Sequence, residues 1–447
     1  MIRPATIGLC YLLPLIGWAQ VSEPPPIASI EQAHRILKSA PISEGDANRI
    51  RDFVVGKHAG VDLSRGSHRH LLQRKKDGGG FVLWSLKAPQ DAKVSVIAEK
   101  ARRWPMLKLG QSDLWVASEE FADFTSVHYR FDVNGHRLGG GKNNRFGFER
   151  YQWTPDSLVH PNVPKGKLIE MGTHVSKKHF PNSKRSWWIY VPQQYNPQQA
   201  NKTKLIVFQD GSGYCRGDGN ACVVLDNLID QKKIPVAIAV FVNPGTIPTT
   251  ATGTASRSNR GNEYDTCTSR YASFLDEELL PIVRRRFPYS DNPWDHAICG
   301  ASSGGSCAFT AAWHRNDLFR RVISFVGSFC DFRPLETYPV YGSDNSARFD
   351  VADQARQDDF GRWKTAHDYP ALIRKTDPRR QMKVFLQDGK NDLDNRLGNW
   401  FSNNERMASA LAYAGYEYRF VAGKGMHSKR HGMAILPEIL VWIWQET

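Results

Sequence analysis

A glycine-framed serine is the residue whose setting most favours chemistry. The run GASSG at 300–304 has the form G-x-S-x-G, follows the apolar stretch 297–299 and precedes a helical pattern over 306–313. In such a strand–turn–helix, the turn lifts the serine hydroxyl above the end of the strand, and the next backbone N–H can face a developing oxyanion. We therefore predict that Ser302 is a nucleophile and that the Ser303 N–H is an oxyanion donor. Ser303 itself is the alternative nucleophile.

A serine hydroxyl needs a base, and in this arrangement an acid and then a histidine follow the serine along the chain. The apolar stretch 384–387 leads into a loop with three carboxylates, those of Asp388, Asp392 and Asp394. Asp392 fits the pattern strand-Gly-x-x-Asp best. His427 stands in a loop before the last predicted helix, 434–444. The expected triad is Ser302, Asp392 and His427, with the carboxylate orienting the imidazole.

A second oxyanion donor should come from a loop after an earlier strand. Residues 210–213 read DGSG and follow the apolar stretch 205–209. Glycines there allow the backbone to approach a substrate. The Ser212 N–H is the predicted donor, and the N–H groups of Gly211 and Gly213 are the alternatives.

Other histidines raise the question of a metal. His431 lies four residues after His427, a spacing that two metal ligands on a helix could use. No third ligand with suitable spacing is present, so we predict neither metal nor cofactor and expect His431 to support the site or cap a helix. His68 and His70 are expected at the surface.

The positioning elements alternate between apolar strands and amphipathic helices after about residue 165. Strands covered on both faces and separated by helices predict a mostly parallel sheet, so 165–447 is expected to be an α/β domain. The expected strands are 186–192, 205–209, 236–242, 297–299, 322–326 and 384–386, and the expected helices are 269–287, 404–414 and 434–444. The polar stretches 246–262 and 331–369 are expected to be long loops, of the kind that often serve as lids.

The N-terminal third has a different pattern. Residues 20–79 are predicted to be a linker and a helical segment, with one amphipathic run over 29–57. Several short strands separated by turns follow over 80–155, and they predict a small β-sandwich. Trp84, Trp104 and Trp115 could stack on sugars, although at least two of them are expected in the core.

Composition narrows the class of protein. The 447 residues contain 59 Lys and Arg against 45 Asp and Glu, a formal net charge of +14. Hydrophobic residues make up 41%, an ordinary globular value, and no heptad or collagen repeat appears. The basic residues are not interleaved with aromatic ones, so nucleic acid is not an expected partner. The short basic runs are expected to be solvated surface faces, with attraction for anionic substrates, such as acidic polysaccharide or a metal-loaded catecholate, as the alternative.

The N-terminus predicts export. Residues 1–19 have a short basic start, an apolar stretch and small residues before a plausible cut, as in a secretory signal peptide. A secreted or periplasmic location would permit disulfides. Cys215, Cys222 and Cys267 lie in expected loops and are the favoured bridge partners, whereas Cys299 and Cys307 flank the serine motif. After residue 19 no apolar run is long enough to cross a bilayer, so stable membrane insertion is not expected.

Taken together, the segment NRGNEYD at 259–265, the run GASSGG at 300–305, and GKND at 389–392 with His427 resemble the enterochelin esterase-like, or esterase D-type, branch of the α/β-hydrolases. That branch includes feruloyl esterases. The resemblance covers about 165–447 and implies an α/β-hydrolase fold with the triad named above. It also implies that Arg260 and Glu263 bind substrate or position a loop, with a structural ion pair as the alternative. Residues 81–147 resemble the immunoglobulin-like early-set domain that precedes such esterases.

These observations predict an exported serine carboxylic-ester hydrolase that works through an acyl-enzyme. The expected partners are small-molecule or glycan esters: enterochelin-type siderophore lactones or hydroxycinnamoyl esters of polysaccharide. Two other functions stay open at this point, a non-catalytic carbohydrate-binding protein on a hydrolase scaffold and an acyltransferase. Oligomeric state is not predicted.

Overall fold

The computed structural model describes residues 24–39, 41–59, 63, 70–76, 78–98, 102–138, 144–216, 220–249, 256–332 and 365–446. The expectations for the signal peptide at 1–19, for His68 and for most of the loop 331–369 lie outside these residues. The chain forms two compact units. The first comprises Met1–Lys75, Gly80–Phe121 and His128–Arg145, and the second comprises Lys76–Gly79, Ala122–Val127 and Phe146–Thr447.

The first unit contains two antiparallel sheets. One has the strand order β1 (His70–Arg74), β2 (Gly80–Lys87), β6 (Leu114–Phe121) and β5 (Leu107–Lys108). The other has the order β4 (Arg103–Pro105), β3 (Val94–Ala98), β7 (Thr125–Val133) and β8 (His136–Leu138), with β9 (Arg145–Phe148) also on β7. The Trp84 ring of β2 lies 5.0 Å from that of Trp104 in β4 and 6.0 Å from that of Tyr129 in β7, so aromatic side chains fill the space between the sheets.

Trp84 and Trp104 are therefore core residues. The sheets also begin earlier than the predicted position 80, because β1 pairs with β2 from His70 onward. His70 is half-buried, and its Nδ1 lies 2.7 Å from the Tyr129 hydroxyl oxygen, whereas the sequence pattern predicted a surface histidine.

Two helices, not one, precede the strands. They are α1 (Ile30–Lys38) and α2 (Glu44–Lys57). The expected single run is interrupted because Ser43 caps α2: its hydroxyl accepts the Asp46 N–H at 3.1 Å. Apolar residues of both helices, among them Ala33 and Ile50, pack on Phe81 of β2 and its neighbours.

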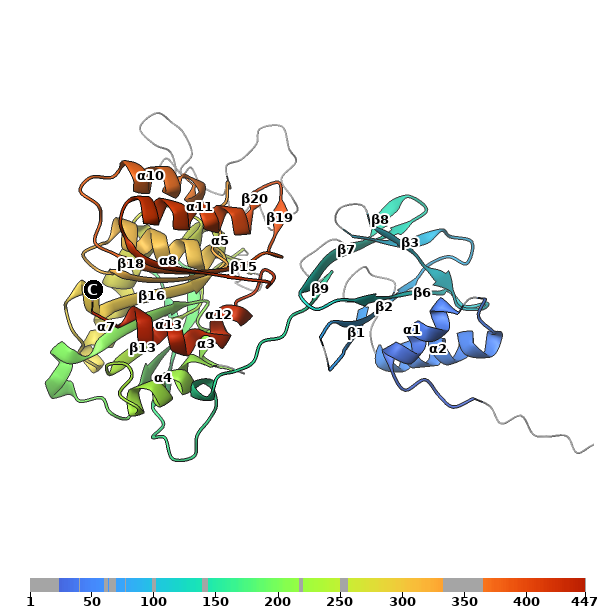
Figure 1. Ribbon diagram of the computed structural model, residues 1–447, viewed down its shortest axis with the longest axis horizontal. Helices are drawn as coiled ribbons and strands as arrows, with labels where there is room; N and C mark the ends of the chain where they lie inside the picture. The colour runs from blue at the N-terminus through green and yellow to red at the C-terminus, as the bar shows by residue number, and fades with distance from the viewer. Residues whose placement is uncertain are drawn as a thin grey trace, which may run out of the picture. The chain divides into compact units, whose positions relative to one another are not determined.

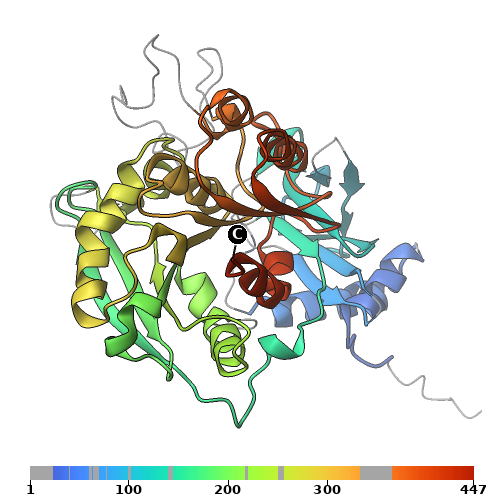
Figure 2. The same ribbon diagram turned by 60° about the vertical axis from the view of Figure 1, so that its left-hand side comes forward.

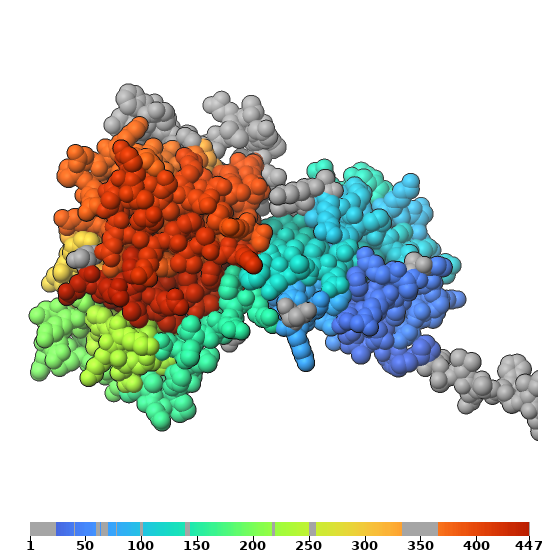
Figure 3. All heavy atoms as spheres, viewed as in Figure 1, coloured from blue at the N-terminus to red at the C-terminus, as the bar shows by residue number. Residues whose placement is uncertain are grey.

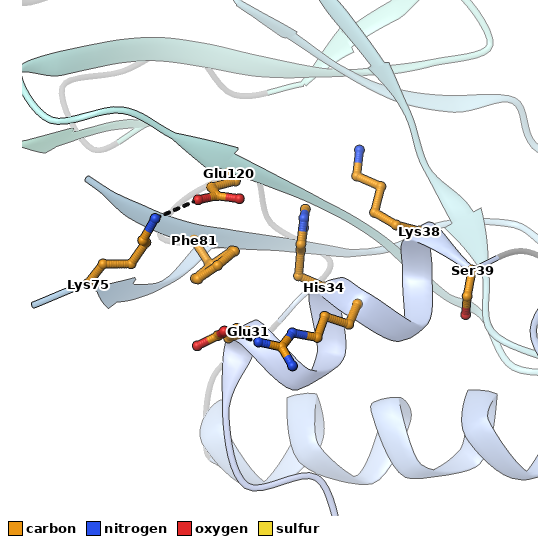
Figure 4. A pocket seen from close by; sticks show the side chains of 8 residues that line it. Glu31, His34, Lys38, Ser39, Lys75, Phe81 and Glu120 are labelled. Atoms are coloured by element: carbon orange, nitrogen blue, oxygen red, sulfur yellow. Dashed lines mark hydrogen bonds and ion pairs between the residues drawn. The ribbon is translucent and has the colours of Figure 1, made fainter. Parts of the chain in front are cut away.

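A shallow groove of about 530 Å³ lies beside α1 in this unit (Figure 4). Glu31, His34 and Lys38 of the helix line it together with Phe81 and Glu120 of the sheet. Lys75 closes one end through an ion pair with Glu120 at 2.8 Å. Charges of both signs line the groove.

The second unit is built on a ten-stranded sheet. Its order is β15 (Ser256–Ser258), β14 (Thr246–Pro248), β11 (Lys184–Val191), β13 (Ala237–Val242), β12 (Lys204–Gln209), β16 (His296–Ala301), β17 (Arg321–Phe325), β18 (Lys383–Gly389) and β21 (Glu417–Gly423), with β10 (Lys167–Val175) paired to β11. From β13 to β21 all neighbours are parallel. A small hairpin of β19 (Asp394–Asn395) and β20 (Gly398–Asn399) follows β18.

Helices cover both faces of this sheet (Figures 1 and 2). One face packs against α6 (Arg270–Phe274), α7 (Leu280–Arg286), α8 (Ser303–His314), α10 (Tyr369–Lys375) and α11 (Trp400–Tyr413). The other packs against α3 (Ser212–Cys215), α4 (Ala221–Asp230), α12 (Arg430–Ala434) and α13 (Leu436–Ile443). Figure 3 shows the red C-terminal residues beside the yellow-green residues of α4 on the surface of this unit, in keeping with the contact between α13 and α4. The short helix α5 (Arg260–Tyr264) packs on α8.

The α/β-hydrolase fold expected from the alternating pattern is confirmed, with two differences at its start. The second compact unit begins its main stretch at Phe146, earlier than the predicted residue 165, although Phe146–Phe148 also pair with β7 as part of β9. The predicted helix 269–287 is α6 and α7 joined by a π-helical turn at Leu275–Leu279. Within the described residues no helix is long and apolar enough to cross a membrane.

The three cysteines favoured as bridge partners differ in their surroundings. Cys215 and Cys222 are thiols in this structure, and Cys267 is buried in the core instead of lying in an open loop. Cys299 and Cys307 are buried small apolar side chains beside the serine motif.

Candidate active site

Ser302 stands at the sharp turn between β16 and α8. Its backbone has φ 59° and ψ −128°, a strained conformation for a residue with a side chain. The Ser302 N–H donates to Phe325 O at 2.9 Å, and the Ser302 carbonyl accepts the Ser328 N–H at 3.1 Å, so neighbouring β17 holds the turn. A Cβ on Gly300 would collide with the backbone of Gly304, which explains the glycine frame of the motif.

His427 joins the serine to an aspartate. Its Nε2 lies 2.8 Å from Ser302 Oγ, and its Nδ1 lies 2.6 Å from Asp392 Oδ1. The three side chains come from loops after β16, β18 and β21, whose carboxyl ends share one edge of the sheet. With Nδ1–H donating to the carboxylate, Nε2 carries the lone pair that can accept the serine proton. The arrangement can therefore activate a serine hydroxyl as a nucleophile.

The acid loop distinguishes the three candidate carboxylates. The Asp392 side chain is fully buried, and its Oδ1 also accepts the Leu393 N–H at 2.5 Å. Asp388 is buried too, but its oxygens accept the Gly389 N–H and Asn404 Nδ2–H at 2.6 and 2.7 Å. Asp394 is exposed on β19. Of the three, Asp392 is the one that contacts the imidazole.

Burial sets the electrostatics of this loop. It raises the pKa of Asp392 to about 6, even though a hydrogen bond with Asp388 lowers it. Burial and then the nearby Asp392 raise the pKa of Asp388 well above its ordinary value. The carboxylate at Asp392 is the form that can accept the His427 Nδ1–H.

One oxyanion donor is well placed. The Ser303 N–H opens α8, directly after the serine, and takes no hydrogen-bond partner within the described part of the chain. All three N–H groups proposed for the second donor are already engaged. Ser212 donates to Asn243 Oδ1 at 2.9 Å, Gly211 to Val242 O at 3.1 Å and Gly213 to Asp210 O at 3.0 Å. An oxyanion at Ser212 would have to displace the Asn243 side chain.

Two residues near the nucleophile were missed by sequence reasoning. Ser328 Oγ lies 3.2 Å from Ser302 Oγ and accepts the Trp400 Nε1–H at 3.0 Å. The Trp400 ring also meets the His427 ring edge to face, with centroids 5.7 Å apart. A signal for Ser328 existed, because it follows β17, the strand between those of the serine and the aspartate.

Arg260 and Glu263 have different positions. Arg260 lies beside the serine turn, where its Nη2 donates to Ala301 O at 3.2 Å and its Nε and Nη2 bind Asp210 at 2.9 and 2.8 Å. Glu263 is not brought to the site: it forms a fully buried ion pair with Arg185, with Nη1 2.6 Å from Oε2. The Glu263 carboxylate also accepts the Asn259 Nδ2–H and the Gly245 N–H. Its contacts are those of the structural ion pair that the sequence left as the alternative.

His431 supports the site from α12. Its ring stacks on that of Tyr151, with centroids 4.7 Å apart, and its Nδ1 lies 3.2 Å from Gln387 Nε2. Burial lowers the pKa of His431, which keeps it neutral. Within the described ranges, no three His, Cys, Asp or Glu side chains gather as metal ligands.

Lys429 lies between the histidine loop and the loop after β12. Its Nζ donates to Gly213 O and stands 3.9 Å from the centroid of the Tyr214 ring. Burial lowers the pKa of this amine. The lysine therefore ties the base loop to the segment expected to supply the second oxyanion donor.

Known proteins share this architecture. Two curated relatives align with part of the chain: an iron(III) enterobactin esterase of Escherichia coli, 26% identical over 169 residues, and the uncharacterised protein YbbA of Bacillus subtilis, 22% identical over 158 residues. The alignments cover 38% and 35% of this chain, and 37% and 62% of those two proteins.

Among solved structures, the enterochelin esterase of Shigella flexneri superposes with a TM-score of 0.53 at 16% identity, over 85% of this chain and 96% of that one. The ferric enterobactin esterase of Salmonella typhimurium gives a TM-score of 0.50 at 16% identity, over 84% and 96%. These likenesses establish the fold. The model of the family described as Putative esterase matches residues 179–443, more than half of the chain. The chain belongs to that esterase family.

Proposed function

We propose that this protein is a serine carboxylic-ester hydrolase. The observation that carries the proposal is the hydrogen-bonded series from Ser302 Oγ through His427 to the buried Asp392, at 2.8 and 2.6 Å. The strained backbone of Ser302 and the N–H of Ser303 at the start of α8 support it, because together they present a nucleophile beside an oxyanion donor.

The first half-reaction forms an acyl-enzyme. Ser302 Oγ attacks the ester carbonyl carbon while its proton passes to His427 Nε2, and the carbonyl oxygen becomes an oxyanion facing the Ser303 N–H. Asp392 stabilises the imidazolium through Nδ1–H. The C–O bond to the alcohol then breaks, and His427 returns the proton to the leaving alkoxide oxygen.

The second half-reaction releases the acid. His427 Nε2 takes a proton from a water, whose oxygen attacks the acyl carbon. The resulting tetrahedral intermediate expels Ser302 Oγ, which recovers the proton from His427. The products are a carboxylic acid and the free enzyme.

We propose catecholate siderophore lactones of the enterobactin type as the substrate class. Support comes from the relative that is an iron(III) enterobactin esterase and from the net charge of +14, which suits an anionic iron-loaded catecholate. A panel of enterobactin, its ferric complex, methyl ferulate and feruloylated oligosaccharides tests this choice. Faster turnover of the ferulate esters, measured as kcat/KM, would move the assignment to hydroxycinnamoyl esters.

The activity itself is tested by p-nitrophenyl acetate hydrolysis and by labelling with a fluorophosphonate. We expect Ser302→Ala to lose about 10⁴-fold or more in kcat and all labelling. Equal turnover by both proteins would overturn the proposal and leave a binding role. Product analysis with an added sugar acceptor separates the remaining alternative, since ester transfer to the acceptor in preference to water would indicate an acyltransferase.

Export is part of the proposal, on the pattern of residues 1–19. Expression of the full chain in bacteria, followed by fractionation and N-terminal sequencing, tests it. Mature protein beginning near Gln20 in the periplasm or medium is the expected result. An uncleaved chain in the cytoplasm would contradict it.

A further inference from the structure

The Glu149 carboxylate binds both sequence neighbours of His427. Glu149 follows β9 and is only 3% exposed. Its Oε1 accepts the Met426 N–H at 3.2 Å, and its Oε2 accepts the Ser428 hydroxyl at 2.5 Å. The residues on either side of the catalytic-base candidate are thus attached to one side chain that lies 277 residues earlier in the chain.

The loop that carries His427 is held by contacts with other segments of the chain. It runs over 424–429, between β21 and α12, without regular secondary structure. The acid loop secures its first half, where Asn391 donates its N–H to Gly425 O at 3.0 Å and its Nδ2–H to Lys424 O at 2.8 Å. Glu149 secures the part around the histidine itself. Hydrogen bonds to an ionised acceptor are among the stronger ones a loop can make.

The segment around Glu149 is fixed in its turn. Tyr151 donates its hydroxyl to Glu149 Oε1 at 2.8 Å and stacks its ring on His431 of α12. Arg430 Nη1 donates to the Glu149 carbonyl oxygen at 3.4 Å. Residues 149–151 therefore contact both the loop 424–429, here called the base loop, and the first turn of α12. We name Glu149 and Tyr151, with these contacts, the Glu149 brace.

The brace lies outside the part of the chain that carries the family resemblance. The family model begins at residue 179, and the strands that carry the triad begin at His296. The brace is nevertheless part of the same compact unit, which begins its main stretch at Phe146.

We propose that Glu149 is a positioning residue, which holds the His427 imidazole in line with Ser302 Oγ; this inference rests on the esterase function proposed above. A displacement of the imidazole by about 1 Å can cost about 100-fold in rate without changing substrate binding. The role differs from that of Asp392, which bonds to the imidazole nitrogen itself, because Glu149 acts only through the backbone and side chain of the adjacent residues.

The test compares Glu149→Gln and Glu149→Ala with the wild type, well below the melting temperature of each protein. We expect kcat for a p-nitrophenyl ester to fall about 10-fold in Glu149→Gln, which keeps one acceptor oxygen, and up to about 100-fold in Glu149→Ala. KM should stay within about 2-fold. The rate of Ser302 labelling by a fluorophosphonate should fall in the same proportion as kcat, since both reactions need the imidazole in place.

Glu278 provides a matched control in the same unit. This carboxylate is also largely buried and accepts backbone N–H groups, those of Lys177, Lys178 and His179, together with the Ser176 hydroxyl. It secures the loop 176–179, not the base loop. Glu278→Gln should lower the melting temperature at least as much as Glu149→Gln and leave kcat and labelling unchanged.

The outcomes separate the two proposals. The positioning role would be overturned if Glu149→Gln and Glu278→Gln lost kcat equally, or if both Glu149 variants kept the wild-type kcat. In either case an inactive Ser302→Ala would leave the esterase proposal intact. Full activity in Ser302→Ala would overturn the esterase proposal first. If Glu149→Ala does not give a cooperative melt, the near-isosteric Glu149→Gln alone decides the matter.

Discussion

Ser328 Oγ lies 3.2 Å from Ser302 Oγ and accepts the Trp400 Nε1–H, so a buried indole directs the hydroxyl next to the nucleophile. Ser328 is 1% exposed and Trp400 3% exposed. Because the indole N–H fills one acceptor position of Ser328, the Ser328 hydroxyl proton is free to point toward Ser302. The nucleophile is thus surrounded by polar groups on two sides, the imidazole and this hydroxyl.

Ser328→Ala should destabilise the protein by about 1–3 kcal/mol, since it leaves the buried Trp400 N–H without an acceptor. Urea unfolding measures the change. The double variant Ser328→Ala/Trp400→Phe removes both partners, and we expect it to cost less than the sum of the two single changes. Strict additivity would show that the two side chains do not interact in solution.

Glu263→Gln should be among the most destabilising single changes, at about 3–5 kcal/mol, because it leaves the fully buried Arg185 guanidinium without its counter-charge. The folded fraction of Glu263→Gln should keep the wild-type KM for small esters, because Glu263 contacts Arg185 and not the nucleophile. A selective rise in KM with unchanged stability would instead restore the substrate-binding role predicted from the sequence.

Asp392 and Asp388 should respond differently to the same substitution. Asp392→Asn should lose about 10⁴-fold in kcat, as expected when the imidazole loses its orienting carboxylate. Asp388→Asn should retain most of the activity, because the Asp388 side chain bonds to the Gly389 N–H and Asn404 Nδ2–H and not to the imidazole. The two kcat values decide which carboxylate is the acid of the triad.

Activity should fall on the acid side. Burial raises the pKa of Asp392 to about 6, and protonation there removes the acceptor for the His427 Nδ1–H. We expect kcat/KM to decline below about pH 6. The negative charge of Glu149 also raises the pKa of Asp392, so the acid limb should move to lower pH in Glu149→Gln. If the acid limb of the kcat/KM profile lay at the same pH in wild type and Glu149→Gln, the negative charge of Glu149 would not act on Asp392.

The raised pKa of Asp392 also affects stability. Low pH should lower activity, but it should favour the folded state. The folded pKa of about 6 exceeds the value of about 3.9 in an unfolded chain, so the folded state binds the proton more tightly. The contribution of Asp392 to the free energy of unfolding is therefore full below about pH 4 and is lost as the pH rises through 6. Urea unfolding of wild type and Asp392→Asn from pH 4 to 7 should show the difference narrowing or changing sign along this interval.

Much of this arrangement could be predicted from local patterns. The serine turn was evident because strand, glycine frame and helix are adjacent in the chain, and Asp392 and His427 follow in the order that parallel strands impose. The α/β layers followed from buried strands such as β12 and β16, whose central residues are apolar.

Contacts between distant segments could not be predicted in this way. Nothing near Ser212 indicates that its N–H is engaged by Asn243, and nothing near Glu149 indicates a partner 277 residues away. Glu263 shows the same limit, because the motif around it suggested a role near the substrate, whereas the Arg185 that neutralises it comes from strand β11. Ion pairs and loop anchors of this kind depend on the folded arrangement.

The extent of the second compact unit determines how far the chain can be shortened before activity is lost. A shortened chain starting at residue 165 would keep every member of the triad and the entire parallel sheet, yet it would lack Glu149 and Tyr151. Such a fragment should hydrolyse esters poorly, because its base loop loses the Glu149 brace. The smallest active fragment is then longer than the region that the family model matches, 179–443, and its first residue lies before residue 149.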